Sequence, residues 1–269
     1  MSQLPPLGAG PRVLLGCTGS VATIKVPELA RCLQERGASV VIVPTKNACH
    51  FLRMQAKVDA GPQRRTVGGG SGFLGPEGKT SKNGELRCSD SEEQNSCSDQ
   101  CSQCGSRSPI GVLGPEGGND SALRSLYPDL NFILDQDEWA AWSGRGDPVL
   151  HIQLRDWAQV MVIAPLDANT MAKIAQGLCD NLLTCIVRAW DTARPLVFCP
   201  AMNTHMYKHP LTMRHTAMLK DLGYIEVCVV TKKLACGDTG PGGMADLDTV
   251  VNAVMQELPG AQRISHGPF

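Results

Sequence analysis

The stretch Ala164-Pro165-Leu166-Asp167-Ala168-Asn169-Thr170 decides the fold of this chain. It follows an apolar run at 160–163, typical of a buried parallel strand, and precedes a helix-like stretch at 171–177. The Asp, Asn and Thr at this junction predict that a helix starts directly after the strand. In an open α/β sheet, ligands bind beyond the carboxyl ends of the strands. We therefore expect this stretch to place backbone amides, an Asn side chain and a Thr hydroxyl beside a ligand.

Strand-like and helix-like segments alternate along the rest of the chain. Strands are predicted at 12–17, 39–43, 131–134, 160–164, 195–199 and 224–230. Helices are predicted between and after them, at 21–36, 45–55, 135–142, 149–158, 171–177, 181–190, 212–222 and 248–258, with a Gly-rich loop at 232–243. This alternation predicts an α/β fold, a doubly wound and mostly parallel six-stranded sheet of the Rossmann-like type, in one domain over residues 1–269.

The alternation is interrupted between residues 57 and 128, where Gly, Ser, Pro, Asn, Gln and charged residues replace the apolar periodicity. A Leu-Gly-Pro-Glu-Gly motif occurs twice there, at 74–78 and 113–117. A structureless connection of this length is uncommon inside a compact domain, so we predict a disordered insertion; retained non-coding sequence in the gene model would look the same. Its cysteines are too irregularly spaced for the paired ligands of structural zinc, and no metal site is predicted: Cys88, Cys97, Cys101 and Cys104.

The composition excludes several kinds of partner. The formal net charge of -1 gives no basic surface for nucleic acid. No apolar run approaches the roughly 18 residues of a membrane span, and the Pro/Gly-rich start lacks the pattern of a signal peptide. Several cysteines lie in or beside apolar runs, as expected of free thiols in a reducing compartment: Cys17, Cys179, Cys185, Cys199 and Cys228. We expect a cytoplasmic protein with no nucleic-acid or membrane partner.

Polar residues follow the first two predicted strands. Gly16-x-x-Gly19 resembles the start of a dinucleotide fingerprint, but the third glycine and the acid after the second strand are absent, which argues against NAD. Residues 18–20 (Thr-Gly-Ser) at a helix start favour one phosphate group, and 45–47 (Thr-Lys-Asn) would add hydroxyl, amide and positive charge. A mononucleotide fits this pattern better than a dinucleotide, although ordinary turn residues would have the same composition.

The 164–170 stretch resembles, nearly residue for residue, the Pro-x-x-Ala-Asn-Thr signature of the flavin-dependent cysteine decarboxylases. Further stretches resemble the phosphopantothenoylcysteine decarboxylases of that family, in register and in the same order: residues 19–22, 147–152, 177–185, 200–203 and 233–238. The resemblance covers about residues 12–52 and 132–257. One four-residue match would be weak, whereas this many at strand ends are specific.

The resemblance implies a flavoprotein-type fold, bound FMN and a homotrimer with the flavin near the contact between subunits. It implies that these residues surround the FMN: Gly19, Ser20, Val21, Thr45, Lys46, Asn47, Asp167, Ala168, Asn169, Thr170 and Ala201. The implied reaction is decarboxylation of 4'-phosphopantothenoylcysteine to 4'-phosphopantetheine in coenzyme A biosynthesis. In the family, flavin oxidises the cysteine moiety to a thioaldehyde, loss of CO2 gives an enethiol, and protonation with reduction by the same flavin leaves no net redox change.

The resemblance also implies individual roles. His151 matches the catalytic base, Cys236 the thiol that protonates the enethiol, and Asn203 the residue that holds the substrate carboxylate. The structural alternatives are a core histidine, an incidental thiol and a helix N-cap, respectively. Three further residues would frame the substrate: Lys233, Ala235 and Met206, the last of which is otherwise a gap-filling side chain.

Two positions depart from the family pattern. Asp156 stands where the family often has a second basic residue, and Gly243 stands where it has alanine, so we expect reduced but not abolished activity. Two other functions would use the same fold. One is that of another superfamily member, such as a peptidyl-cysteine decarboxylase or a flavin prenyltransferase, and the other is a non-catalytic relative that inhibits a protein phosphatase. The 200–203 and 233–238 stretches favour the first reading, and relatives of the last kind can lack the histidine or the cysteine, both of which are present here.

Overall fold

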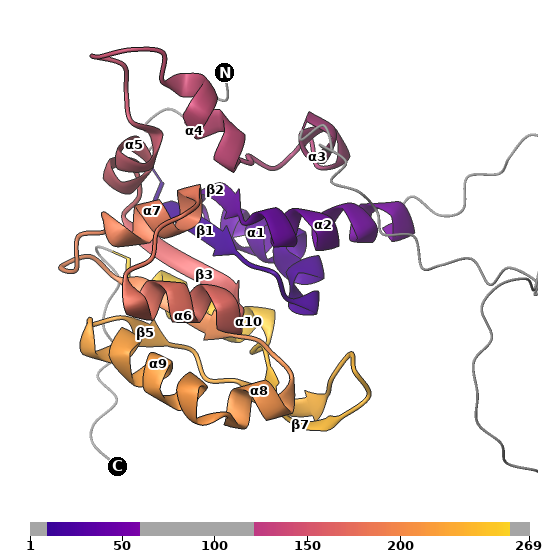
Figure 1. Cartoon of the computed structure of the whole chain (residues 1–269). Coiled ribbons are helices and arrows are strands. Elements are labelled where there is room, and N and C mark those ends of the chain that lie inside the picture. The colour runs from indigo at the N-terminus through magenta and orange to yellow at the C-terminus, as the bar shows by residue number, and fades with distance from the viewer. Residues whose placement is uncertain (1–9, 60–120, 259–269) are drawn as a thin grey trace, which may run out of the picture. The chain divides into compact units, whose positions relative to one another are not determined.

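The computed structural model describes residues 10–59 and 121–258, which are organised around a parallel sheet (Figure 1). The strand order is β2-β1-β3-β4-β5, and every neighbouring pair in this sheet is parallel. The strands are β1 (Arg12–Cys17), β2 (Ser39–Pro44), β3 (Val160–Leu166), β4 (Leu196–Pro200) and β5 (Ile225–Glu226). The predicted α/β class with a parallel sheet is confirmed.

Helices cover both faces of the sheet, which explains why the strands read as continuous apolar runs. Every residue of β3 and β4 is buried. One face packs against α1 (Val26–Glu35), α2 (Lys46–Asp59) and α10 (Leu247–Gln256), through residues such as Leu29, Leu52 and Val250. The other face packs against α5 (Leu150–Trp157), α6 (Ala168–Gln176), α7 (Leu182–Arg188) and α9 (Pro210–Asp221). The sheet is therefore doubly wound.

The sheet has five strands, not the predicted six. The apolar run at 131–134 forms no strand: only an isolated bridge joins Phe132 to Ile42. Its side chains are nevertheless in the core, with Phe132 and Leu134 almost fully buried. Burial alone thus produced the strand-like pattern, because an apolar run does not distinguish a buried connection from a buried strand. The predicted strand at 224–230 is reduced to the two residues of β5 at the edge of the sheet.

The Gly-rich segment predicted as a loop forms a hairpin instead. Its strands are β6 (Val230–Lys233) and β7 (Thr239–Gly243), which pair antiparallel. Leu234 N donates to Asp238 O at 2.8 Å across the turn, and Gly237 adopts a left-handed φ of 92° that favours glycine. The predicted helix over 21–36 is two elements, a short 3-10 helix η1 (Val21–Lys25) and then α1.

Both borders of the predicted insertion at 57–128 differ from the prediction. Helix α2 continues to Asp59, and α3 (Ser121–Leu126) occupies part of the far border. Tyr127 is buried, and its hydroxyl donates to Leu52 O at 3.0 Å, which joins the two borders. The described residues on both sides belong to one compact unit. The rest of the predicted insertion, with its four cysteines, lies outside the described residues.

Two short helices complete the framework, α4 (Asp135–Ala141) before α5 and α8 (Thr204–Lys208) after β4. Within 10–59 and 121–258, no helix combines the length and the apolar character needed to cross a bilayer.

Candidate functional site

The topological switch point of the sheet lies between β1 and β3. From β1 the chain moves to β2 on one side and later returns to β3 on the other, which makes the crevice beyond their carboxyl ends the expected ligand site. Three hydrogen bonds join the two loops there: Thr18 Oγ1 to Pro165 O at 3.0 Å, Asp167 N to Thr18 Oγ1 at 2.7 Å, and Gly19 N to Asp167 Oδ2 at 2.9 Å. The 164–170 stretch therefore lies at the crevice, as its sequence predicts.

A cavity of about 580 Å³ opens at this crevice. Its walls are the loop after β1, the start of α6, the loop after β4 and the β6–β7 hairpin. This volume falls within the roughly 300–1,000 Å³ that small-molecule sites occupy. The structure brings many of the sequence-predicted residues together in its lining: Gly19, Ser20, Val21, Asp167, Ala168, Ala201, Asn203, Met206, Lys233, Ala235 and Cys236.

Gly19 stands where two loops approach closely. A Cβ at this position would lie 2.7 Å from Asn47 Cβ and 3.0 Å from Asp167 Oδ2, so a side chain does not fit there. Ser20 follows as the N-cap of η1, and its hydroxyl accepts from Ala22 N at 3.4 Å. The nearby cavity walls include apolar side chains from Val21, Ile24 and Phe51. A polar loop with Gly19 and Ser20 beside an apolar wall suits a ligand with a polar tail and a flat ring.

Other predicted cofactor residues lie just outside the cavity lining. Thr45 and Thr170 are buried at helix starts, where Ala48 N donates to Thr45 Oγ1 at 3.4 Å and Thr170 N donates to Asp167 Oδ1 at 2.7 Å. Asn47 lies against Gly19, at the margin of the site. Two further predicted cofactor residues are exposed beside these helix starts: Lys46 and Asn169.

Asn203 and Cys236 meet at the cavity. Asn203 is the N-cap of α8, and its Oδ1 accepts from His205 N at 2.8 Å. Its Nδ2 donates to Cys236 Sγ at 3.1 Å and to Asp238 Oδ2 at 2.9 Å. Asn203 is therefore both the N-cap of α8 and a residue of the cavity, and the two roles do not exclude each other.

Asp238 was not among the sequence candidates. Its Oδ2 also accepts from Cys236 Sγ at 3.4 Å. The pKa of the Asp238 carboxyl lies below its usual range because Asn203, and then Cys236, donate hydrogen bonds to it. Its position two residues after Cys236, within a turn, is the sequence feature that could have indicated a site role for Asp238.

His151 lies elsewhere, on α5, and does not line the cavity. Figure 1 shows α5 and the β6–β7 hairpin at opposite ends of the sheet. The Nδ1 atom of His151 contacts Oε1 of Glu138 on α4, and both side chains are largely buried. One subunit therefore does not bring His151 and Cys236 together. Glu138 was also missed, because nothing in the sequence indicates how α4 packs against α5.

The two departures from the family pattern have structural consequences. Asp156 forms an ion pair with its neighbour Arg155, with Nη2 and Oδ1 2.7 Å apart. At Gly243, a Cβ would lie 2.4 Å from Cε of Lys232, whose Nζ donates to Met244 O at 3.0 Å. The lysine stem thus occupies the space that an alanine methyl group would need.

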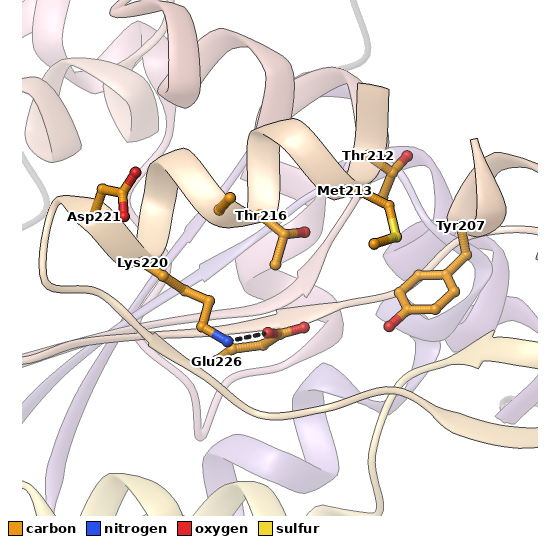
Figure 2. Close-up of a pocket in the computed structure, with 8 residues that line it drawn as sticks. Tyr207, Thr212, Met213, Thr216, Lys220, Asp221 and Glu226 are labelled. Atoms are coloured by element: carbon orange, nitrogen blue, oxygen red, sulfur yellow. Dashed lines mark hydrogen bonds and ion pairs between the residues drawn. The ribbon is translucent and has the colours of Figure 1, made fainter. Parts of the chain in front are cut away.

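A second hollow of about 400 Å³ lies between α8, α9 and β5 (Figure 2). Lys220 Nζ and Glu226 Oε2 are 3.4 Å apart there, and burial, followed by the charge of Glu226, raises the pKa of Tyr207. A buried, paired charge on an edge strand protects the strand from pairing with another chain. This hollow contains none of the predicted site residues. Across the described ranges, no group of three or more His, Cys, Asp or Glu residues is placed to hold a metal ion.

The fold and the crevice define an α/β protein whose ligand site lies at the switch point of a parallel sheet. The model of the Flavoprotein family matches residues 6–259, and the chain belongs to this family. It is 40% identical over 248 residues to phosphopantothenoylcysteine decarboxylase of Mus musculus, which covers 92% of this chain and 87% of the mouse protein.

The chain is also similar to solved structures, including two at 37% identity. One is a cysteine-to-serine mutant of PPC decarboxylase complexed with pantothenoylaminoethenethiol, with a TM-score of 0.63 and 37% identity over 91% of this chain and 97% of that chain. The other is the FMN-binding protein AtHal3, with a TM-score of 0.61 and 37% identity over 91% of this chain and 95% of that chain. The resemblance stated from the sequence is confirmed.

Proposed function

We propose that this chain is an FMN-dependent decarboxylase that converts 4'-phosphopantothenoylcysteine to 4'-phosphopantetheine. The contact between Asn203 Nδ2 and Cys236 Sγ at the cavity carries the proposal, because it places a carboxylate-binding amide beside a proton-donating thiol. The name of the mouse relative and the enethiol complexed with the PPC decarboxylase mutant support the same substrate.

FMN fits the cavity at the switch point. Gly19, Ser20 and Val21 would hold it from β1, the 167–170 segment from β3, and Ala201 from β4, with 45–47 at the margin. When bound, FMN supplies reversible two-electron oxidation of the cysteine moiety of the substrate.

The chain's own residues bind the substrate and move its protons. Asn203 holds the substrate carboxylate through its amide, and Lys233, Ala235 and Met206 frame the rest of the cysteine moiety. After CO2 is lost, Cys236 donates the proton that the enethiol needs. Asp238 accepts hydrogen bonds from both Asn203 and Cys236 and so keeps them at the same place.

We further propose a homotrimer in which His151 reaches the cavity of a neighbouring subunit. Exposed apolar residues lie on the segments beside His151: Trp139 (80% exposed), Trp142 (54%) and Val149 (40%). A second exposed apolar group lies at the cavity: Val21 (46%), Ile24 (37%) and Met206 (49%). A ring in which the first group covers the second is a heterologous interface, which closes at a fixed subunit number. Such a ring buries both groups and completes each site with a histidine.

We also propose that the chain is a single flavoprotein domain, interrupted by the insertion predicted at 57–128, in a cytoplasmic protein. Cys17 and Cys199 are buried free thiols at strand ends, which suits a reducing compartment.

The test uses the full-length protein. We expect it to purify with FMN absorbance and to release one CO2 and one 4'-phosphopantetheine per 4'-phosphopantothenoylcysteine consumed. Cys236→Ser should stop product formation, whereas Cys228→Ser, at an exposed thiol outside the cavity, should not. An FMN-loaded protein that leaves this substrate intact but decarboxylates a peptide with a C-terminal cysteine would contradict the proposal, and so would one that decarboxylates neither.

A further inference from the structure

His151 has a carboxylate partner on a different helix. Its Nδ1 contacts Oε1 of Glu138, with side-chain exposures of 26% for His151 and 17% for Glu138. A carboxylate only accepts hydrogen bonds, so the proton between these two atoms belongs to Nδ1. In the neutral imidazole, the other ring nitrogen, Nε2, then carries the lone pair.

Helix α4, which carries Glu138, is fixed by its other acidic residues. Asp135 Oδ1 accepts from Leu182 N at 2.9 Å, at the start of α7. Asp137 Oδ2 accepts from Leu134 N at 2.7 Å and forms an ion pair with Arg124. These contacts fix the first turn of α4 against α7 and α3, and Glu138, in the same turn, reaches His151 from this support.

The charge of Glu138 also reaches α7. The pKa of the Cys185 thiol is raised to about 11, first by burial and then by the nearby charge of Glu138. Glu138 thus lies at the contact of α4, α5 and α7, where water is largely excluded, and a carboxylate in such a place orients a histidine more firmly than one at an exposed site does.

We propose that Glu138 is the positioning residue of His151: it fixes the imidazole in the tautomer with Nδ1 protonated and leaves Nε2 to take the substrate proton. This inference rests on the proposed function, in which His151 acts as the base. The pairing follows the general rule that a carboxylate behind a histidine sets its tautomer and orientation and stabilises its charged form. Glu138 touches neither substrate nor cofactor and acts only through His151.

The test combines kinetics with a double-mutant cycle. Glu138→Ala should lower kcat roughly 10- to 100-fold with KM unchanged, because only the proton-transfer step loses its orientation. Glu138→Gln keeps an acceptor for Nδ1 and should recover part of that loss. Gln136→Ala, at an exposed position of the same helix, is the matched control and should leave kcat unchanged. FMN absorbance and thermal unfolding of each variant show whether the fold is intact.

In a His151→Asn background, Glu138→Ala should cost no further activity, since the two residues act as one unit. The same loss in both backgrounds would overturn the proposal. An independent readout is the ring 15N spectrum of histidine-labelled protein, with the His151 signal assigned from the His151→Asn variant. We expect a protonated Nδ1 in the wild type and a shift toward protonated Nε2 in Glu138→Ala. An unchanged tautomer would refute the positioning role even if His151 is catalytic, whereas full activity of His151→Asn would refute its role as base.

Discussion

Both amide hydrogens of Asn203 are engaged in the structure, one by Cys236 and one by Asp238. A substrate carboxylate that binds Asn203 must therefore displace one of them, and Asp238, as a like charge, is its direct competitor. The pKa of Asp238 is lowered, so its contact with Asn203 is present at neutral pH. This contact is lost only as the pH falls below the usual value of about 3.8 and through the lowered folded-state value.

Asp238→Ala should separate binding from proton transfer. We expect KM to fall roughly 2- to 5-fold because the competing charge is gone, and kcat to fall about 10-fold because Cys236 loses its acceptor. Steady-state kinetics over a range of substrate concentrations measure both. Asp248→Ala, at an exposed carboxylate on α10, is the control. A rise in KM would show that Asp238 attracts the substrate rather than competing with it.

Two adjacent glycines should respond differently to alanine. Gly242 has a φ of 133°, and a Cβ there would lie 2.4 Å from the backbone oxygen of Met202, so Gly242→Ala should cost roughly 1–3 kcal/mol and loosen the cavity wall. At Gly243, the methyl group meets only the flexible stem of Lys232, and the cost should stay below about 1 kcal/mol. Urea unfolding of the two variants makes the comparison. Equal destabilisation would contradict it.

At the scale of elements, the junction of β3 and α6 organises the site. Asp167 caps α6 through Thr170 N and reaches across to Gly19 N, so one carboxylate joins the two loops that form the crevice. Asp167→Ala should lower the free energy of unfolding by about 1–2 kcal/mol and speed the release of FMN. Asp167→Asn keeps one acceptor oxygen. In urea unfolding and in the rate of flavin loss, it should lie between the wild type and Asp167→Ala. FMN release at the wild-type rate in Asp167→Ala would contradict this role.

The sequence predicted those elements whose period and boundary residues agree. Strands β1 to β4 and the position of Asp167 follow from apolar runs that end in capping residues. The run at 131–134 was wrongly predicted as a strand, because Phe132 is buried in the core although only one bridge, to Ile42 of β2, pairs this run with the sheet. The β6–β7 hairpin was missed because its strands contain Gly and Pro, whose low strand propensity is outweighed by pairing. Glu138 was missed for a related reason, since contacts between helices do not follow from either helix alone.

At the scale of the whole molecule, the predicted site is divided between two places. Asn203 and Cys236 line the cavity, whereas His151 lies on α5, in contact with Glu138 of α4, at the other end of the sheet (Figure 1). Trp139→Asp should weaken trimer assembly and lower activity without unfolding the subunit, because it places a charge on the proposed interface. Leu178→Asp changes an exposed apolar residue outside both groups, with 58% exposure, and should leave assembly intact. Sedimentation measures both, and equal behaviour of the two variants would contradict this interface.

Subunit complementation tests most directly whether one site combines residues of two subunits. His151→Asn protein, strongly impaired alone, and Cys236→Ser protein, inactive alone, are dissociated, mixed in equal amounts and reassembled. If each cavity receives its histidine from a neighbour, about one quarter of the sites in a random ring combine an intact cysteine with an intact histidine, so about one quarter of wild-type activity should return. If no activity returns although mixed trimers form, both residues must act within one subunit, and the proposed site is wrong.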